Sequence, residues 1–170
     1  MDVFYFEGDV LTEKAMPIEV RKARREDLGR INDLTDAMHK YMAGLYGLEL
    51  STHELEEEHY DEDELEDVYV AVDAERGVVI GYMSFSHGRD EWAGPHYALG
   101  HMVVDEDYGS LGIGRELFSV LAQRAREECV NITTGTLKRN KRAMEFYESL
   151  GFKPLSVRLL LDIQERLFKD

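Results

Sequence analysis

The sequence has little of what indicates a secreted, metal-binding or membrane-spanning protein. Its single cysteine, Cys129, excludes a disulfide framework and a cysteine metal cluster. Its six histidines show no ligand spacing such as His-x-x-x-His on one helix, so we expect no metal. No apolar run approaches the length of a membrane span, and residues 1–9 are acidic where a signal peptide is basic. We therefore expect a soluble, cytoplasmic protein without a membrane partner.

Basic residues are scarce in the first hundred positions. Residues 1–100 carry 24 acidic and 9 basic side chains, whereas residues 101–170 carry 11 of each, so the first part holds the whole net charge of −15. Ten acidic side chains crowd into residues 54–67. Such a run is usually a solvated helix face. The alternative is an anionic wall that attracts a cationic ligand and repels nucleic acid, so we expect no nucleic-acid partner.

A glycine-rich turn joins a buried strand to an amphipathic helix. The apolar run Ala98–Val104 predicts the strand, and Val104–Gly114 reads Val-Asp-Glu-Asp-Tyr-Gly-Ser-Leu-Gly-Ile-Gly. The helix begins near Ile113 with an apolar residue every fourth position, and Cys129 ends that apolar side, which predicts a buried structural thiol. This order directs the first backbone N–H groups of a helix toward an anion.

Glycine-rich turns taken alone more often bind nothing, and two nucleotide motifs are excluded here by spacing. A P-loop needs Lys and then Ser or Thr after its last glycine, but Arg115 and Glu116 follow Gly114. A dinucleotide fingerprint needs a third glycine where Leu117 stands. A pyrophosphate held by the helix N-terminus remains the ligand that fits the turn best.

Hydrophobic periodicity and capping signals predict the other elements. The sequence Ser51-Thr52-His53-Glu54 is a capping box that opens a second helix, and Asn140 caps the last one. Strands are predicted at 18–23, 67–72, 78–85, 131–137 and 156–163, and the first helix near residue 25. The strand at 131–137 must run parallel to the strand at 98–104, because a helix connects them.

Two segments resemble the GNAT superfamily of N-acyltransferases. Residues 104–114 look like the acyl-CoA pyrophosphate loop of that family, Arg/Gln-x-x-Gly-x-Gly/Ala after a Val-ended strand. Residues 140–152 are similar to its Asn-x-x-Ala-x-x-Phe-Tyr-x-x-x-Gly-Phe, and the two segments stand at the family's separation. The sequence departs from the pattern at Gly109 and Ser110, where the family usually has Arg or Gln and then Gly. A loop cation for the pyrophosphate is therefore missing.

The resemblance covers residues 18–165 and implies an α/β (α+β) fold. We expect a mixed, twisted central sheet of about six or seven strands, flanked by about four helices, with a splayed parallel strand pair that holds CoA. Residues 17–170 would form a single GNAT-like acyltransferase domain. Residues 1–16 would be an N-terminal extension, either an edge strand or a tail, and the protein would be a monomer or a homodimer.

The same resemblance implies acetyl-CoA as co-substrate and N-acetylation of a primary amine by direct attack, with the acidic segment favouring a cationic amine. The alternatives are a non-catalytic acyl-CoA-binding regulatory domain and an acetyltransferase of protein N-termini or lysines. Segments 42–52 and 87–96, the second with Trp92 and His96, are the candidate acceptor loops. The family's site residues correspond here to Met102, Val103, Val104, Gly109, Ser110, Leu111, Gly112, Ile113, Gly114, Arg115, Asn140, Arg142 and Tyr147 for acetyl-CoA.

The resemblance implies a general acid, and the chemistry of amine transfer also requires a proton acceptor. Tyr147 stands where the family places the phenol that protonates the departing thiolate, although simple core packing would also explain it. The candidate base is Glu106, with Asp105, His101, His96 or a water chain as alternatives. The basic cluster at 138–142 is either a solvated helix start or a contact for the adenosine 3′-phosphate.

Overall fold

The computed structural model describes residues 16–109 and 111–161. They form a five-stranded sheet in the order β1-β2-β3-β4-β5, antiparallel throughout except for the parallel pair β4 and β5. The strands are β1 (Ile18–Lys22), β2 (Val68–Asp73), β3 (Val78–Asp90), β4 (Gly94–Val104) and β5 (Asn131–Thr134). The predicted mixed α/β fold and the parallel pair are confirmed, with fewer strands than the six or seven expected.

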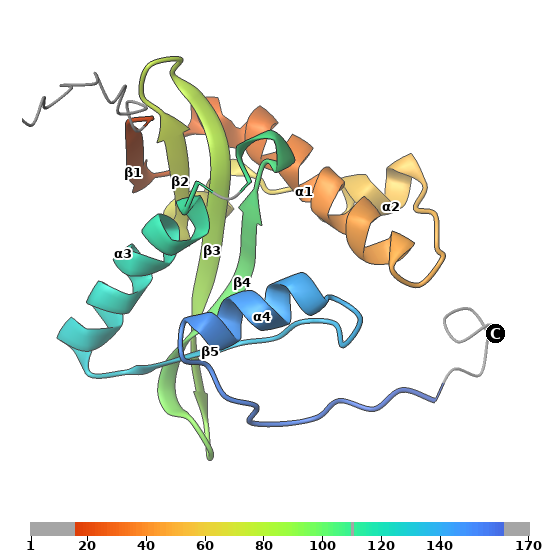
Figure 1. Ribbon diagram of the computed structural model, residues 1–170, viewed down its shortest axis with the longest axis vertical. Helices are drawn as coiled ribbons and strands as arrows, with labels where there is room; N and C mark the ends of the chain where they lie inside the picture. Colours follow the sequence, from red (N-terminus) through yellow and green to blue (C-terminus); the bar gives the residue numbers. More distant parts are fainter. Residues whose placement is uncertain (1–15, 110, 162–170) are drawn as a thin grey trace, which may run out of the picture.

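Helices cover both faces of the sheet. In Figure 1, α1 lies against one face, α3 crosses the other, and α4 lies beside the end of β5. Ser51 and Glu54 form the predicted capping box, although the helix that they open is only five residues long. Within the described residues the α-helices are α1 (Leu28–Gly44), α2 (Thr52–Glu56), α3 (Ile113–Glu128) and α4 (Lys141–Ser149), and the 3-10 helices are η1 (Arg25–Asp27), η2 (Glu62–Asp67) and η3 (Glu106–Tyr108).

Each face of the sheet has its own hydrophobic core, as the alternation of strand side chains requires. The α3-side core consists of Ala71, Ile80, Met83, Phe85, Tyr97, Leu99, Ile113, Leu117, Leu121 and Ala125, which include the predicted apolar stripe of α3. The α1-side core consists of Ile31, Leu34, Leu65, Val68, Val70, Val72, Val79, Tyr82 and Val103.

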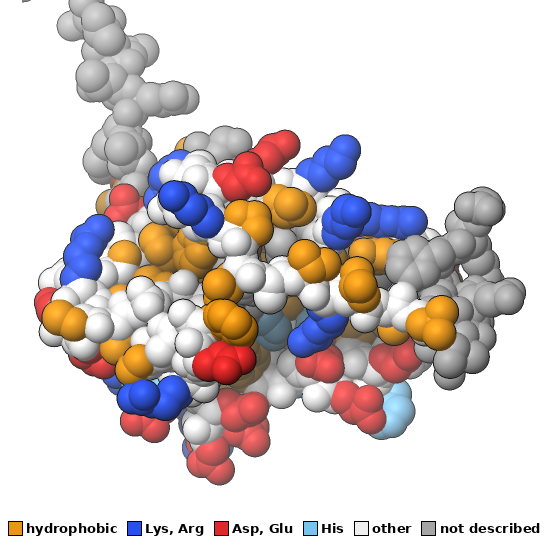
Figure 2. Space-filling model, turned by 90° about the horizontal axis from the view of Figure 1, so that it is seen from below, with side chains coloured by type: hydrophobic (Ala, Val, Ile, Leu, Met, Phe, Trp, Pro, Cys, Tyr) orange, Lys and Arg blue, Asp and Glu red, His pale blue; other side chains and the backbone are white. Residues whose placement is uncertain are grey.

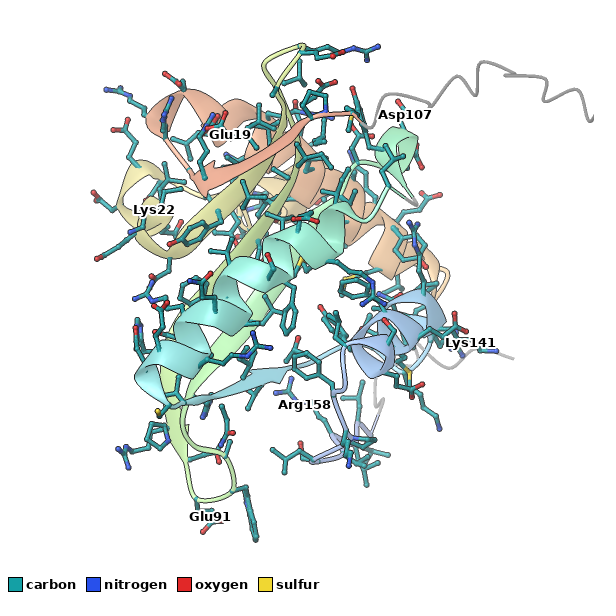
Figure 3. All side chains as sticks on the ribbon, turned by 60° about the vertical axis from the view of Figure 1, so that its left-hand side comes forward. Glu19, Lys22, Glu91, Asp107, Lys141 and Arg158 are labelled. Atoms are coloured by element: carbon teal, nitrogen blue, oxygen red, sulfur yellow. The ribbon has the colours of Figure 1, made fainter. Side chains whose placement is uncertain are left out.

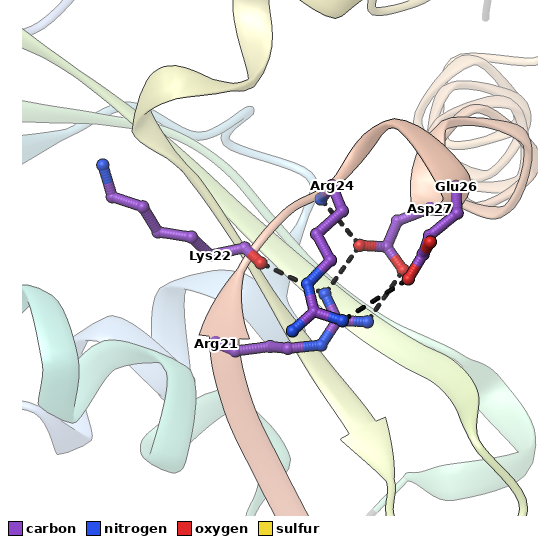
Figure 4. Close-up of polar contacts among 5 residues, drawn as sticks. All are labelled: Arg21, Lys22, Arg24, Glu26 and Asp27. Carbon is purple, nitrogen blue, oxygen red and sulfur yellow. Dashed lines mark hydrogen bonds and ion pairs between the residues drawn. The ribbon is translucent and has the colours of Figure 1, made fainter.

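A buried carboxylate fixes the turn from β1 into α1 (Figure 4). Asp27 is 5% exposed and accepts two hydrogen bonds from the Arg21 guanidinium, at 2.7 and 3.0 Å, and one from the backbone N–H of Arg24 at 2.8 Å. Burial acts to raise the pKa of Asp27, but these hydrogen bonds outweigh it and lower the pKa below its usual range. The ionised carboxylate therefore stabilises the fold.

We predict that Asp27→Asn lowers the free energy of unfolding by about 2 kcal/mol at pH 7, because it removes charge-assisted hydrogen bonds from a buried site. Since the folded pKa lies below the unfolded one, this stabilisation is complete above the unfolded pKa and disappears as the pH falls through the folded pKa. Urea unfolding at pH 7 and at acid pH measures both effects. The control is Glu26→Gln in an exposed 3.4 Å pair with Arg24, which should change stability little. If Asp27→Asn lowered the free energy of unfolding as much at acid pH as at pH 7, the ionised Asp27 carboxylate would not be the source of the stabilisation.

Strand β4 extends beyond its parallel partner. Pairing between β4 and β5 runs from His96 opposite Asn131 to Leu99 opposite Thr134. Beyond Leu99, β4 continues to Val104 paired with β3 alone. One edge of residues 100–104 therefore lacks a strand partner among the described residues, at the place where the family resemblance implied a splay.

Three expectations are corrected or fall outside the description. The strand predicted at 156–163 is absent over its described part, residues 156–161, because that segment leaves the sheet after Gly151 and pairs with none of the described strands. The apolar side chains of this segment are exposed, and Leu159 is 89% exposed. Figure 2, which views the molecule from below, shows exposed hydrophobic side chains, and Figure 3 labels Arg158 of the same segment. Cys129 is exposed rather than buried, because its left-handed backbone (φ 55°) ends α3. The extension at 1–16 lies outside the described residues except for Met16.

Candidate active site

The glycine turn leads from β4 through η3 into α3. Gly112 is the N-cap of α3 in a left-handed conformation (φ 79°) that favours glycine. Since Gly112 has no side chain, it cannot cap the first N–H groups of the helix, which leaves them available to an anion. Asp105 anchors the start of the turn: its side chain accepts from the N–H of Asp107 at 3.0 Å and pairs with Arg30. Ser110, inside this turn, lies outside the described residues.

A cation from α4 reaches the turn where the loop itself lacks one. A Cβ placed on Gly109 would lie 3.5 Å from Nη2 of Arg142. The two helices also touch, since a Cβ on Gly114 would lie 3.1 Å from the Phe146 ring. Asn140 fixes the start of α4 by accepting from the N–H of Ala143 at 3.1 Å, as predicted. The fold therefore supplies a guanidinium beside Gly109 from a helix about thirty residues later in the chain.

Two other basic residues predicted for this region have side-chain partners outside the turn. Arg139 donates to the carbonyl of Leu45 at 3.1 Å and lies over the Tyr46 ring, so it ties the approach to α4 to the end of α1. The Arg115 guanidinium donates to Ser149 Oγ at 2.7 Å, at the opposite end of α4 from Arg142. Lys141, labelled in Figure 3, is exposed at the start of α4.

Tyr147 lies at the point where β4 and β5 separate. It packs against the α3-side core, with Phe146 and Phe152 at 5.5 Å between ring centroids. It lies next to Thr134, whose hydroxyl donates to the carbonyl of Leu99 at 3.2 Å, and Thr134 and Leu99 are the last pair of β4 and β5. Burial raises the pKa of Tyr147, and the neighbouring Thr134 side chain only partly opposes it. The phenol therefore stays protonated and can donate a proton.

The exposed edge of β4 presents a defined set of backbone groups. The N–H groups of His101 and Asp105 point toward β3, where they donate to Ser84 Oγ at 3.1 Å and to the carbonyl of Ile80 at 2.9 Å. Because backbone groups alternate along a strand, those of Met102 and Val104 point to the other edge, where β5 has ended. Val103, also predicted as a cofactor contact, has its carbonyl beside Gly81 of β3.

The acidic segment is fastened to α1 beside β4. Asn32 forms two hydrogen bonds with the backbone of Tyr60, at 2.8 and 3.1 Å, and Asp36 pairs with His59 at 2.7 Å. The Tyr60 hydroxyl consequently reaches Nδ1 of His101 on β4, at 2.8 Å. Sequence reasoning missed Tyr60, because only the fold brings it next to β4; the polar His101 inside an apolar strand was the one signal of this contact.

The remaining candidates lie elsewhere. Glu106 is exposed on η3, the helix on which Figure 3 labels Asp107. His96 is 9% exposed, and its Nδ1 lies 2.9 Å from the carbonyl of Gly94. Trp92, 77% exposed, is at the tip of the β3–β4 hairpin, which Figure 1 shows at the far end of the sheet from the glycine turn. None of the helices in the described part of the chain is long and apolar enough to cross a membrane.

Comparison with known proteins identifies the family to which the chain belongs. The model of the acetyltransferase (GNAT) family matches residues 31–152, and the chain belongs to this family. The L-amino acid N-acyltransferase MnaT of Escherichia coli (strain K12) is 28% identical over 137 residues, which are 79% of each chain. The thialysine N-epsilon-acetyltransferase of Bos taurus is 30% identical over 79 residues, which are 46% of each chain.

Solved structures share the fold at low sequence identity. A tetramutant of the BH1408 protein from Bacillus halodurans superposes with a TM-score of 0.70 at 21% identity, over 84% of this chain and 98% of that one. The aminoglycoside N-acetyltransferase AAC(6')-Iy in complex with CoA superposes with a TM-score of 0.64 at 15% identity, over 85% and 93%. At these identities the likeness establishes the fold alone.

Proposed function

We propose that this protein transfers the acetyl group of acetyl-CoA to a primary amine that is cationic in solution. The observation that carries the proposal is the combination of three groups: the unpaired edge of β4, the uncapped start of α3 and the partly buried phenol of Tyr147. Backbone donors, an anion site and a proton donor are the parts that a thioester with a pyrophosphate tail requires.

The site fits acetyl-CoA as a substrate. The pyrophosphate would bind the first N–H groups of α3, with the Arg142 guanidinium in place of the missing loop cation. The pantetheine arm would pair with the backbone groups of Met102 and Val104 as an added strand. The N–H of Val104 or Met102 would then polarise the thioester carbonyl, and Tyr147 would protonate the departing sulfur.

The acceptor is proposed from charge. The acidic segment, residues 54–67, is held against α1 and contacts His101 of β4 through Tyr60. Its carboxylates would concentrate a cation near that strand. The names of the two curated relatives, an acyltransferase of L-amino acids and an acetyltransferase of thialysine, support a small amine with a second charged group.

Calorimetric titration with acetyl-CoA, followed by a panel of amines, tests the proposal. We expect binding, turnover of cationic amines, and a KM for the amine that rises with salt, because salt screens the acidic segment. Equal activity on neutral and cationic amines would contradict the assigned acceptor. Binding without any turnover would identify an acyl-CoA-binding regulatory domain instead.

Arg142→Ala is predicted to weaken acetyl-CoA binding about tenfold and to leave kcat nearly unchanged, because it removes a charge-assisted contact made equally in the ground and transition states. Dephospho-CoA, which lacks the 3′-phosphate, distinguishes a pyrophosphate contact from a 3′-phosphate contact. If Arg142 contacts the pyrophosphate, the variant should lose the same factor of affinity for dephospho-CoA as for the complete cofactor. The control is Lys141→Ala, one residue earlier and also exposed. A loss equal to that of this control would show that Arg142 acts only through overall charge.

A further inference from the structure

His101 occupies the part of β4 that has no β5 partner. The alternation of side chains places it on the same face as Val103, which belongs to the α1-side core, while Met102 and Val104 pack against the α3-side core. Tyr147 packs against the α3-side core as well. His101 and Tyr147 therefore lie on opposite faces of the sheet.

A chain of hydroxyl groups surrounds the His101 ring. Nδ1 lies 2.8 Å from the Tyr60 hydroxyl and 3.1 Å from the Tyr82 hydroxyl. The Tyr82 hydroxyl lies 2.7 Å from Oγ1 of Thr35, and Tyr60 donates to Ser84 Oγ at 2.7 Å. These residues come from α1, the acidic segment, β3 and β4, so the fold itself assembles the cluster.

The donors in this chain determine which ring nitrogen carries the proton. Thr35 donates its only hydroxyl proton to the carbonyl of Ile31 at 2.9 Å, so Tyr82 must be the donor to Thr35. Tyr60 likewise gives its proton to Ser84. Both tyrosine oxygens are then acceptors for Nδ1, which must carry a hydrogen. In neutral His101 the lone pair is consequently on Nε2.

The surroundings favour the neutral ring. Burial lowers the pKa of His101, and the neighbouring His39 of α1 lowers it further, while Glu58 of the acidic segment opposes both. The other titratable groups that face the ring are Tyr60 and Tyr82, whose pKa values burial raises, so both remain uncharged phenols. At neutral pH His101 is therefore a base with a free lone pair.

We propose that Nε2 of His101 accepts the proton of the attacking amine, an inference that rests on the proposed function. The ammonium form first loses one proton to solvent, so that the neutral amine attacks. As its nitrogen bonds to the thioester carbonyl carbon, the remaining N–H becomes acidic and that proton passes to Nε2. The carbon–sulfur bond breaks, and the sulfur takes the proton of Tyr147. His101 then returns its proton to solvent, and Tyr147 recovers one. The tyrosine oxygens that accept from Nδ1–H stabilise the imidazolium while it lasts.

The test compares the pH dependence of kcat in the wild type and in His101→Gln, whose amide can still donate to the two tyrosines. We expect kcat of the variant to fall about 100-fold and the part of the acid limb that reports protonation of His101 to disappear, which leaves only the part due to the amine. Ionisation of the amine contributes equally to every profile, so the comparison isolates His101. The control is His53→Gln, whose side chain is 82% exposed on α2, and it should match the wild type.

Two further variants separate a catalytic from a structural role. His101→Ala should regain activity with added imidazole in proportion to its neutral fraction, which a packing defect would not do. Tyr60→Phe, which removes one acceptor from Nδ1–H, should move the acid limb to lower pH. Nitrogen-15 NMR of the wild type should show hydrogen on Nδ1 in the neutral ring, independently of turnover.

Different results would contradict the role of His101 and the proposed acetyltransferase activity. A wild type that acetylates no amine would overturn both. An active wild type whose His101→Gln variant has the same pH profile of kcat as the wild type, or a neutral ring with hydrogen on Nε2, would overturn the role of His101 alone.

Discussion

Tyr147→Phe is expected to lower kcat about 1,000-fold and to leave the KM for acetyl-CoA nearly unchanged, because general acids contribute between about 100- and 10,000-fold. The variant loses only the hydroxyl: its ring keeps the contacts with Phe146 and Phe152, so the fold should be preserved. Steady-state kinetics over a wide pH range make the measurement. Burial raises the pKa of Tyr147, so the wild type should keep its acid form well into the alkaline range.

The leaving group provides a sharper version of this test. An acyl donor whose thiol is more acidic needs less protonation, so the deficit of Tyr147→Phe should shrink as the pKa of the leaving thiol falls. The control is Tyr69→Phe on β2, which removes a phenol from a residue packed against the same α3-side core. A deficit that is constant across donors would show that the hydroxyl positions the substrate rather than protonates it.

Gly81→Ala is expected to lower the free energy of unfolding by about 3 kcal/mol and to weaken acetyl-CoA binding as well. The new Cβ would lie 2.8 Å from the carbonyl oxygen of Val103 and 3.4 Å from Cα of Val104 and a methyl of Ile113. Backbone on β4 would have to move, and overpacking of this kind costs about 1–3 kcal/mol. The displaced peptides are those proposed to bind the pantetheine arm.

The matched control is Gly29→Ala in α1, where nothing lies within 4 Å of the new Cβ. It should be neutral or stabilise the protein by about 0.5–1 kcal/mol, since alanine favours a helix. Urea unfolding and calorimetry on both variants make the comparison. If Gly81→Ala kept the stability and the affinity of the wild type, the close approach of β3 to β4 at this point would have no role in the site.

Local signals in the sequence were sufficient for most of the fold. The capping box at Ser51, the Asn140 cap and the apolar stripe of α3 each depend on residues a few positions apart, and all three are confirmed. The strand predicted at 156–163 is wrong over its described part. A run of apolar residues indicates that a strand could form, but it does not provide a neighbouring strand with which to pair. The prediction of a buried Cys129 is wrong, because Cys129 itself takes the left-handed conformation that ends α3 and its side chain is exposed there.

The candidate site was predictable only where it follows a contiguous motif. The glycine turn and Tyr147 stand in such motifs. The guanidinium of Arg142 beside Gly109 and the cluster around His101 are contacts between residues that lie 17 to 66 positions apart in the sequence, such as Tyr60 and His101, which are 41 positions apart. No periodicity or spacing encodes such contacts, because packing of α1 and α4 against the sheet creates them.

The unpaired edge of β4 also bears on how this enzyme could diversify. A site made of main-chain N–H and C=O groups keeps its donors and acceptors through nearly every substitution except proline or a clash such as that at Gly81. The acidic segment, which packs beside the α1-side face of the same strand, presents side chains instead, and substitutions there can change its charge without altering these main-chain groups. Under the proposed function, the donor half of the site is therefore inherited with the fold, and the choice of acceptor can drift independently of it.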